Sequence, residues 1–194
     1  MYIAHFIIGY LLGSVPFGFI ISKIWKQDIR RQGSGNIGAA NVYRSLGAVA
    51  GGVVFALDYL KGFFAISLGF WLGGDPVSIL VLGASVILGH VFSIFLKFKG
   101  GKGVATGFGV LAGIAPDIFM LVLLFVLVML ITTRYVSLTS ILSAILASGL
   151  MFVFHEPLPY SLFSAAIALF IILSHTANIR RLLQGKEPRL GEKG

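Results

Sequence analysis

The chain of 194 residues is long enough for one soluble domain, but only 11% of its residues are charged, whereas soluble domains carry about 25%. Hydrophobic residues make up 57% of the chain, which is typical of an integral membrane protein. There are no cysteines, which excludes thiol nucleophiles, thiolate metal sites and disulfides. The net charge of +8 favours an anionic lipid surface or anionic substrates as partners. Nucleic acid is disfavoured as a partner, because there is no long basic tract.

Apolar stretches of membrane-spanning length follow one another along the chain. The first, residues 1–24, has no basic residue before Lys23, so we interpret it as a retained span and not as a signal peptide. Further stretches cover residues 50–72, 77–96, 104–133, 136–154 and 159–178. The stretch 104–133 contains Pro116 and Asp117 in its middle, where a turn is favoured. The sequence therefore allows six or seven spans.

The placement of Lys and Arg favours seven spans. With an external N-terminus, seven helices put 14 of the 15 basic residues in cytoplasmic segments, namely residues 23–44, 97–102, 134 and 179–194. The remaining one, Lys61, lies within a span, and the external turns contain no Lys or Arg. This distribution follows the positive-inside rule. The predicted fold is an all-α polytopic membrane helix bundle of seven transmembrane helices, with its N-terminus outside and its C-terminus cytoplasmic. We expect a single domain over residues 1–194, with the short helix at 104–115 packed inside the bundle.

The first cytoplasmic segment holds a glycine-rich loop that begins Gly33-Ser34-Gly35-Asn36-Ile37-Gly38. It matches GxGxxG, but a membrane helix precedes it in place of the strand that a dinucleotide site requires. Its glycines still allow backbone N–H groups to approach an oxyanion, and Ser34, Asn36 and Asn41 add side-chain donors. The loop is therefore either an anion site or a flexible inter-helix connection with a helix cap.

Two further cytoplasmic segments also lead into helices. Gly101-Lys102-Gly103 precedes the helix at 104, which places Lys102 as a phosphate clamp, whereas Lys97 and Lys99 can be snorkelling lysines. Arg134 precedes the helix at 136, either as part of a site or as a topology-setting residue beside a cap. We expect the N-termini of the second, fourth and sixth spans, with their unsatisfied N–H groups and partial positive charge, to converge on one phosphate site.

Other polar residues lie near or within the spans. His175 and Asn178 share one helix face with Arg181 or Leu182, as a polar site or as an ordinary helix end stabilised by cations. Asp58 and Lys61 are three residues apart within a span, and the cost of burying charge predicts that they pair, as a structural tie or as part of the site. His90 is interpreted as a core histidine.

Three stretches together resemble the PlsY family, the small bacterial membrane glycerol-3-phosphate acyltransferases that take their acyl chain from acyl-phosphate. These stretches are residues 33–41, 89–106 and 175–187, and in order and spacing they cover essentially the whole chain. Two positions depart from the family pattern, because Ala40 stands where Thr is usual and Ser93 stands where Pro is common.

The resemblance implies that acyl-phosphate and sn-glycerol 3-phosphate react to 1-acylglycerol 3-phosphate (lysophosphatidic acid) and inorganic phosphate, as the first step of phospholipid synthesis. It implies a multi-pass enzyme of the bacterial cytoplasmic membrane, with its site facing the cytoplasm among membrane lipids. We expect no metal, no cofactor and no obligatory protein partner. The residues assigned to catalysis are Lys102, His175, Asn178 and Arg44. The residues assigned to substrate and phosphate binding are Ser34, Gly35, Asn36, Gly38, Asn41, Gly101, Gly103, Ser140 and Ser143.

The sequence also bears on the chemistry. The His-x-x-x-x-Asp pair of soluble-type acyltransferases is absent, because the residues five after the histidines are Tyr10, Phe95, Tyr160 and Arg180. We therefore expect direct attack by the glycerol hydroxyl without an acyl-enzyme, with His175 or a substrate phosphate oxygen as the base. The rival classes are a transporter or channel for a small anion and a structural membrane subunit. The second leaves both glycine motifs unexplained.

Overall fold

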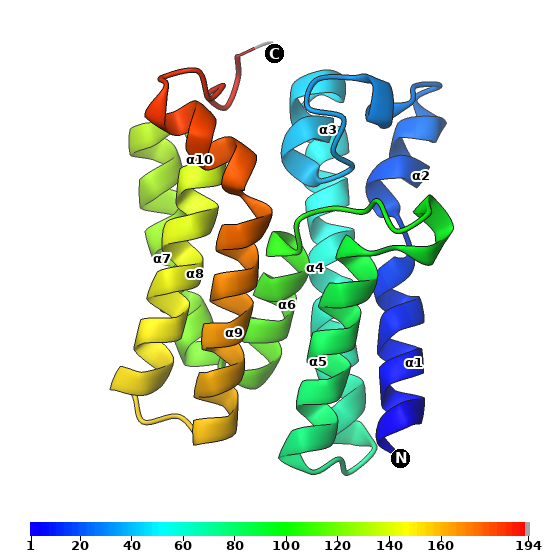
Figure 1. The fold of residues 1–194 in the computed structure, drawn as a ribbon, viewed down its shortest axis with the longest axis vertical. Coiled ribbons are helices and arrows are strands. Elements are labelled where there is room, and N and C mark those ends of the chain that lie inside the picture. Colours follow the sequence, from blue (N-terminus) through cyan, green and yellow to red (C-terminus); the bar gives the residue numbers. More distant parts are fainter. Residues whose placement is uncertain (193–194) are drawn as a thin grey trace. The chain divides into compact units, whose positions relative to one another are not determined.

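The computed structural model describes residues 1–192, and every regular element among them is a helix, as predicted. The chain divides into two compact units, residues 1–113 and 114–192, which are described separately below (Figure 1). Lys193, one of the predicted cytoplasmic cations, lies outside the described residues. The expectation of one domain stays a prediction.

The first unit contains most of the predicted spans and both glycine motifs. Its helices are α1 (Tyr2–Ser14), α2 (Phe17–Ile24), α3 (Ala39–Leu46), α4 (Ala48–Trp71), α5 (Pro76–Val91) and α6 (Val104–Ile114), with 3₁₀ turns η1 (Ile29–Arg31) and η2 (Ile94–Leu96). The division between the units falls at the last residue of α6.

The first predicted span is broken between α1 and α2. Pro16 has no N–H group and cannot continue the hydrogen-bond ladder of α1. The Val15 N–H therefore turns back to the Leu12 carbonyl at 3.4 Å, and helical bonding resumes at Ile20, whose N–H donates to the Pro16 carbonyl. The break leaves carbonyl groups within the membrane-spanning segment that need donors from elsewhere.

Glycines allow the helices of the first unit to pack backbone against backbone. A Cβ atom on Gly13 of α1 would collide with the Val86 carbonyl of α5, and one on Gly89 of α5 would collide with the Tyr10 carbonyl of α1. Between α4 and α6, Gly62 lies on the Thr106 carbonyl in the same way. Small residues at such contacts are characteristic of helix packing in membranes.

The second unit consists of α7 (Pro116–Thr133), α8 (Val136–Val153), α9 (Leu158–Ser174) and α10 (Thr176–Leu183). Helix α8 packs against α7, α9 and α10. The predicted turn in the stretch 104–133 is confirmed, since α6 ends at Ile114 and Pro116 is the first residue of α7. Helices α9 and α10 are bent by 59° at His175, where the last predicted span continued to residue 178.

Five segments among the described residues are long and apolar enough to cross a membrane, and the bent pair α9 and α10 makes six if it counts as one span. The five are Tyr2–Ile24, Ala48–Trp71, Pro76–Leu96, Pro116–Thr133 and Val136–Val153. Helix α6, at 11 residues, is shorter than the about 20 that a span needs. The predicted seven-helix count and the orientation stay predictions.

Within each unit, the two ends differ in charge. In the first, the Tyr2 hydroxyl donates to Asp75 at 3.3 Å, so the N-terminus lies beside the α4–α5 turn, opposite the basic loops. In the second, the Arg134 guanidinium donates to the Leu190 carbonyl at 2.8 Å, which joins the start of α8 to the basic tail. His155 and Glu156 occupy the α8–α9 turn at the other end. Both units thus fit the predicted separation of charge.

Cysteine labelling tests the predicted orientation directly, because the chain has no cysteine of its own. An impermeant thiol reagent applied outside is expected to modify cysteines placed at positions 75 and 156. Cysteines at positions 34, 102 and 190 are expected to react only after the membrane is opened. External modification at 34 or 102 would contradict the seven-helix assignment.

Candidate active site

The glycine-rich loop depends on backbone angles that favour glycine. Gly33 and Gly35 have φ values of +51° and +71°, in the left-handed region that other residues rarely adopt. The Gly35 N–H donates to the Gln32 carbonyl at 2.9 Å, which closes a tight turn around Gly33 and Ser34. Ser34 is exposed at the tip of this turn.

Asn41, in the first turn of α3, holds the loop in shape. Its side chain is buried, with 1% of its surface exposed. Its Oδ1 accepts from the Ser34 N–H at 3.0 Å, and its Nδ2 donates to the carbonyls of Gln32 and Asn36 at 3.0 and 2.8 Å. Its amide is thus bonded to the loop backbone on both sides, which gives Asn41 a loop-shaping position. Direct contact with a phosphate stays a prediction.

The loop leads into α3 and not directly into the membrane-spanning helix α4, which begins at Ala48, near the predicted start of the second span at residue 50. The Asn36 Oδ1 accepts from the N–H of Gly38, the residue that precedes α3, at 2.8 Å. Arg44 lies half-buried in the last turn of α3, and α4 begins only after Gly47. The helix N-terminus nearest the glycine loop is therefore that of an eight-residue helix.

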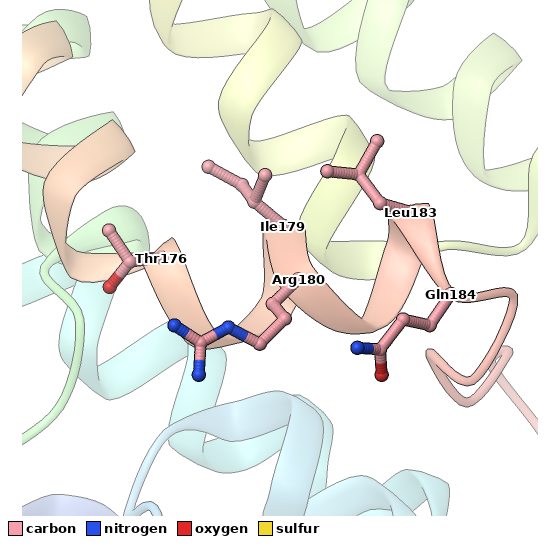
Figure 2. A pocket seen from close by; sticks show the side chains of 5 residues that line it. All are labelled: Thr176, Ile179, Arg180, Leu183 and Gln184. Carbon is pink, nitrogen blue, oxygen red and sulfur yellow. The ribbon is translucent and has the colours of Figure 1, made fainter.

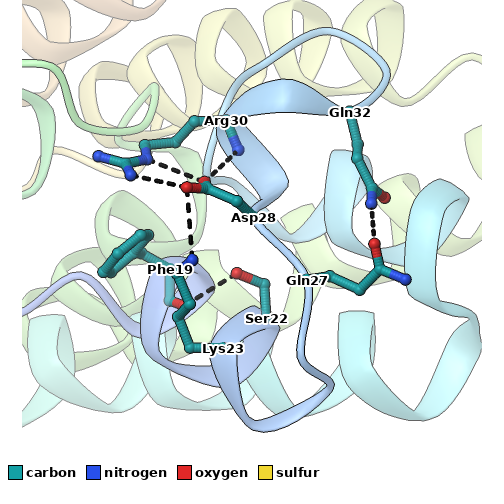
Figure 3. Close-up of polar contacts among 7 residues, drawn as sticks. All are labelled: Phe19, Ser22, Lys23, Gln27, Asp28, Arg30 and Gln32. Carbon is teal, nitrogen blue, oxygen red and sulfur yellow. Dashed lines mark hydrogen bonds and ion pairs between the residues drawn. The ribbon is translucent and has the colours of Figure 1, made fainter.

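Asp28 braces the chain reversal before the loop (Figure 3). It pairs with Arg30 at 2.7 Å and with Lys23 at 3.5 Å, and the Arg30 guanidinium lies 4.5 Å from the centre of the Phe19 ring. The hydrogen bond from Arg30 holds the pKa of the Asp28 carboxyl well below its usual range. Two of the cations in this basic run therefore serve the loop scaffold.

The second glycine motif folds back onto the end of α5. The N–H groups of Gly100 and Gly101 donate to the carbonyls of Val91 and His90 at 2.9 and 3.1 Å. Gly103 has a φ of +85°, and α6 begins immediately after it. Lys102 is half-buried between the buried Gly101 and Gly103, whereas Lys97 and Lys99 are exposed. The phosphate-clamp role of Lys102 and the snorkelling of the other two lysines stay predictions.

One buried apolar cluster joins the two glycine motifs. Ile37, from the first loop, and Leu96, from the turn before the second, belong to the same cluster. Its other buried members are Ile21, Ile29, Val42, Ala50 and Val54. The first unit thus brings Ser34, Gly35, Asn36, Gly38, Asn41 and Arg44 to the same end as Gly101, Lys102 and Gly103.

His175 lies at the bend between α9 and α10, with 3% of its surface exposed. Its Nδ1 is 2.8 Å from the Ile171 carbonyl oxygen and 3.2 Å from the Ser174 hydroxyl. Because a carbonyl oxygen can only accept, we assign the ring hydrogen to Nδ1. In that tautomer the lone pair of the ring lies on Nε2.

Asn178 is held by a carboxylate that the sequence did not single out. Its Nδ2 donates to Glu187 Oε1 at 2.6 Å, and the Arg181 Nε donates to Oε2 at 2.7 Å. Gly185, with a φ of +66°, ends α10: its N–H donates to the Leu182 carbonyl, and the next N–H to the Arg181 carbonyl, at 3.0 and 2.8 Å. This Schellman motif returns the chain to the helix. In the sequence, the signal for the role of Glu187 was limited to Gly185 after the helix end, with the acid two residues later.

The Glu187 carboxyl is buried. Burial by itself raises its pKa, but the hydrogen bonds from Asn178 and Arg181 outweigh that effect and hold the pKa below its ordinary value. The carboxylate is therefore charged at neutral pH and fixes both side chains.

The remaining candidates in the second unit bond to their own helix. Ser140 donates to the Val136 carbonyl at 2.8 Å, and Ser143 donates to the Ser140 carbonyl at 3.1 Å. Such bonds are common for serines within helices. Both hydroxyl oxygens keep acceptor capacity, and a role in substrate binding stays a prediction. Arg134 is engaged with the C-terminal tail through Leu190.

An open hollow of about 430 Å³ lies along α10. Figure 2 shows the side chains that line it, namely Thr176, Ile179, Arg180, Leu183 and Gln184. The hollow combines aliphatic side chains with a guanidinium group, which suits a ligand with an apolar part and an anionic part. It lies next to His175 and Asn178 in the sequence.

The predicted site residues therefore form two groups, one in each unit, and their convergence on one substrate stays a prediction. Among residues 1–192, the structure contains no group of three or more His, Asp or Glu side chains arranged to hold a metal ion.

Comparison with known proteins gives consistent matches over the whole chain. Residues 3–185 match the family model described as glycerol-3-phosphate acyltransferase. Glycerol-3-phosphate acyltransferase 2 of Moorella thermoacetica is 43% identical over 194 residues, which are 100% of both chains. The Bacillus subtilis glycerol-3-phosphate acyltransferase is 44% identical over 95% of each chain.

Two crystal structures of PlsY (YgiH), an integral membrane glycerol 3-phosphate acyltransferase, share the fold. The glycerol 3-phosphate form superposes with a TM-score of 0.94 at 41% identity, covering 98% of this chain and 96% of that one. The lysophosphatidic acid form gives a TM-score of 0.91 at 40% identity, covering 98% and 95%.

Replacing Glu187 by Gln is expected to loosen α10 and the tail. A hydrogen bond to a charged group contributes about 1.5–3 kcal/mol, and we expect about 1–2 kcal/mol here because Arg181 is partly exposed and screened. Hydrogen exchange of residues 176–190 measures the effect, with Glu156→Gln as the control.

The effect of Glu187 depends on pH in a defined direction. Its pKa in the folded chain is lowered, so its stabilisation is complete above the ordinary Glu value of about 4.3 and is lost as the pH falls through the folded pKa. Exchange rates of the wild type and Glu187→Gln are therefore expected to differ at pH 7 and to converge in acid. Equal rates at pH 7 would show that the carboxylate does not hold the tail.

Proposed function

The chain belongs to the glycerol-3-phosphate acyltransferase family, and from this we propose that it transfers an acyl chain from acyl-phosphate to sn-glycerol 3-phosphate. The proposed products are 1-acylglycerol 3-phosphate and inorganic phosphate. The chain is an integral membrane acyltransferase of phospholipid synthesis. We place its site at the cytoplasmic face of a bacterial cytoplasmic membrane, where the predicted topology puts both basic loops.

The dimensions of the loops support acyl-phosphate as the donor. The longest connections between described helices are residues 25–38 and 92–103, and each includes a 3₁₀ turn. Segments of this length can shape a pocket for phosphate, but they offer little surface for the nucleotide of coenzyme A. All proposed substrates and products carry a phosphate, which suits a site built from lysine, arginine and backbone N–H groups.

The hydrogen bond from His175 Nδ1 to the Ile171 carbonyl is the observation that carries the proposed mechanism. In the tautomer assigned from that bond the lone pair lies on Nε2, the atom that we propose as the base, and no carboxylate is needed to set the tautomer. Acyl-phosphate is a mixed anhydride with a good leaving group, so weak base assistance suffices. Such a site suits direct attack without an acyl-enzyme.

The reaction then proceeds in balanced steps. The C1 hydroxyl oxygen of glycerol 3-phosphate attacks the acyl carbonyl carbon, and its proton passes to His175 Nε2 or to a substrate phosphate oxygen. The bond between the acyl carbon and the phosphate oxygen breaks, and inorganic phosphate leaves. No covalent bond to the protein forms at any stage.

Positive groups from the first unit would stabilise this reaction. We assign Lys102, Arg44 and the N–H groups of the glycine-rich loop to the developing oxyanion and the departing phosphate, because fixed donors there lower the barrier most. Asn178, one helical turn after His175 and held by Glu187, is assigned to orienting the acceptor substrate. Ser140 and Ser143 complete the proposed binding set.

Replacing Lys102 by Ala is expected to lower kcat/KM by about 10²–10³, the usual cost of one transition-state charge contact. Thermal unfolding of the purified variant is expected to stay close to that of the wild type. Lys97→Ala is the matched control, because Lys97 is exposed in the same loop and should have little effect. Equal losses from both changes would show that Lys102 sets topology and not catalysis.

The donor is tested by phosphate release from purified protein. Acyl-phosphate is expected to release phosphate only when glycerol 3-phosphate is present, and acyl-coenzyme A is expected to give no lysophosphatidic acid. Added inorganic phosphate should inhibit more than a bulky anion at equal ionic strength, since the pocket is small. Phosphate release without the acceptor, or equal rates with acyl-coenzyme A, would contradict the proposal.

A further inference from the structure

Three ionisable side chains meet in the interior of the first unit, outside the proposed active site. Lys61 Nζ lies 2.8 Å from Asp58 Oδ1 and 2.8 Å from His90 Nδ1. Their exposed fractions are 2% for Asp58, 3% for Lys61 and 4% for His90. The Asp58–Lys61 pair was predicted from its spacing, and the structure confirms it and adds His90 from α5. The proposed reaction uses none of the three.

The Lys61 ammonium also repairs the break between α1 and α2. It donates to the Gly13 and Val15 carbonyls at 2.9 and 3.2 Å, while the Ser93 hydroxyl donates to the Ser14 carbonyl at 2.5 Å. The Val15 carbonyl also accepts from the Phe17 N–H at 3.2 Å. Carbonyls without donors are costly in a membrane interior, so these bonds stabilise the break and hold Lys61 in place.

The position of Lys61 fixes the orientation of the His90 ring. Its Nδ1 lies 2.8 Å from the Lys61 ammonium and 3.4 Å from Asp58 Oδ1, so both charged groups hold that edge of the ring. The Nε2 edge of the ring faces Gly101, because a Cβ atom on Gly101 would collide with it. The ring is thus anchored by Lys61 on one edge and lies against the Lys102 loop on the other.

Two consecutive glycines meet different parts of residue 90. A Cβ atom on Gly101 would collide with the imidazole ring, whereas one on Gly100 would collide with the His90 main-chain carbonyl. The Gly101 N–H also donates to that carbonyl at 3.1 Å. The backbone immediately before Lys102 therefore lies directly on His90.

Helix α4, which carries Asp58 and Lys61, also fixes α6 on the other side of Lys102. A Cβ atom on Gly62 would collide with the Thr106 carbonyl, and one on Gly109 would collide with the Tyr59 carbonyl. The path of α6 is thus set by residues adjacent to the charged cluster. The chain before Lys102 therefore contacts α4 through His90 and Lys61, and the chain after it contacts α4 through α6.

We propose that Asp58, Lys61 and His90 form a positioning cluster for the reaction, in which the His90 ring holds Gly101 so that Lys102 is correctly placed. None of the three touches substrate. The inference rests on the proposed function only in taking Lys102 as the group that meets the phosphates. A displacement of about 1 Å at a reacting group can lower the rate about 10²-fold. The contact between the His90 ring edge and Gly101 can therefore affect the rate through the position of Lys102.

The test is a size exchange between residues 90 and 101. Asn at position 90 keeps a polar group that can accept from Lys61 but lacks the ring edge that faces Gly101. Gly101→Ala is expected to lower kcat/KM by about 10–100-fold through displacement of Lys102. His90→Asn in the same chain is expected to recover most of that loss, because it removes the obstructing ring.

Gly100→Ala is the matched control. Its added methyl group would meet the His90 main-chain carbonyl, which every substitution at position 90 retains, so His90→Asn is not expected to rescue it. Rescue of both alanine variants, or of neither, would overturn the proposal. Kinetic constants per folded molecule that are unchanged in all variants, with only thermal unfolding altered, would show that the cluster is merely structural.

A second readout separates this inference from the proposed function. In the Cys-free chain, Lys102→Cys gives one thiol, whose rate of modification in detergent reports on the position of residue 102 without catalysis. Adding Gly101→Ala is expected to change that rate at least several-fold, and adding His90→Asn should restore it. This result stands whichever acyl donor the enzyme uses, and an unchanged rate in both variants would overturn the positioning role.

Discussion

The first unit depends on a lysine placed where a proline interrupts a membrane helix. Lipid offers no donors to the carbonyls at the break before Pro16. The Lys61 ammonium donates to the Gly13 carbonyl and shares the Val15 carbonyl with the Phe17 N–H, while Asp58 balances its charge. The desolvation cost of both charges is offset only because each has partners in fixed positions. Once Lys61 is held in this way, the His90 ring is fixed, and with it the loop before α6. The break between α1 and α2 is thereby linked to the start of α6.

The two groups of proposed site residues share one construction. The side-chain amide of Asn41 is hydrogen-bonded to the glycine-rich loop, and the carboxylate of Glu187 accepts from Asn178 and Arg181. These buried side chains give the loops a fixed shape although the loops themselves are short and rich in glycine. In the proposed function, backbone N–H groups and cations of these loops meet the ligand from positions that need little reorganisation when charge develops. Rigid loops of this kind suit the proposed reaction, in which both substrates carry a phosphate.

Much of the fold could be predicted from the sequence, because hydrophobic length and charge placement act locally. The spans, the turn at Pro116 and the pairing of Asp58 with Lys61 all follow from such patterns. The sequence could not show that His90 joins that pair, since it lies 29 residues from Lys61 and no periodic signal connects them. It also missed α3, whose eight residues are too few for a clear pattern, and the role of Glu187, which depends on the chain turning back at Gly185. For the site, the residue types were predictable, but the division between groups that shape loops and groups that face a ligand depends on tertiary contacts.

Several of the few acidic residues of the chain pair with cations that hold the structure together. The chain has seven acidic residues, and among the described ones Asp28, Asp58 and Glu187 each pair with a cation of the scaffold. Asp75 instead accepts from the Val77 N–H at 2.9 Å at the start of α5, at the end opposite the basic loops. Three of the acidic residues thus neutralise cations of the scaffold, and one of them, Glu187, also holds Asn178 of the proposed site. In the proposed reaction the cations of the site meet the phosphate groups, and the proton of the attacking hydroxyl passes to His175 or to a substrate phosphate oxygen.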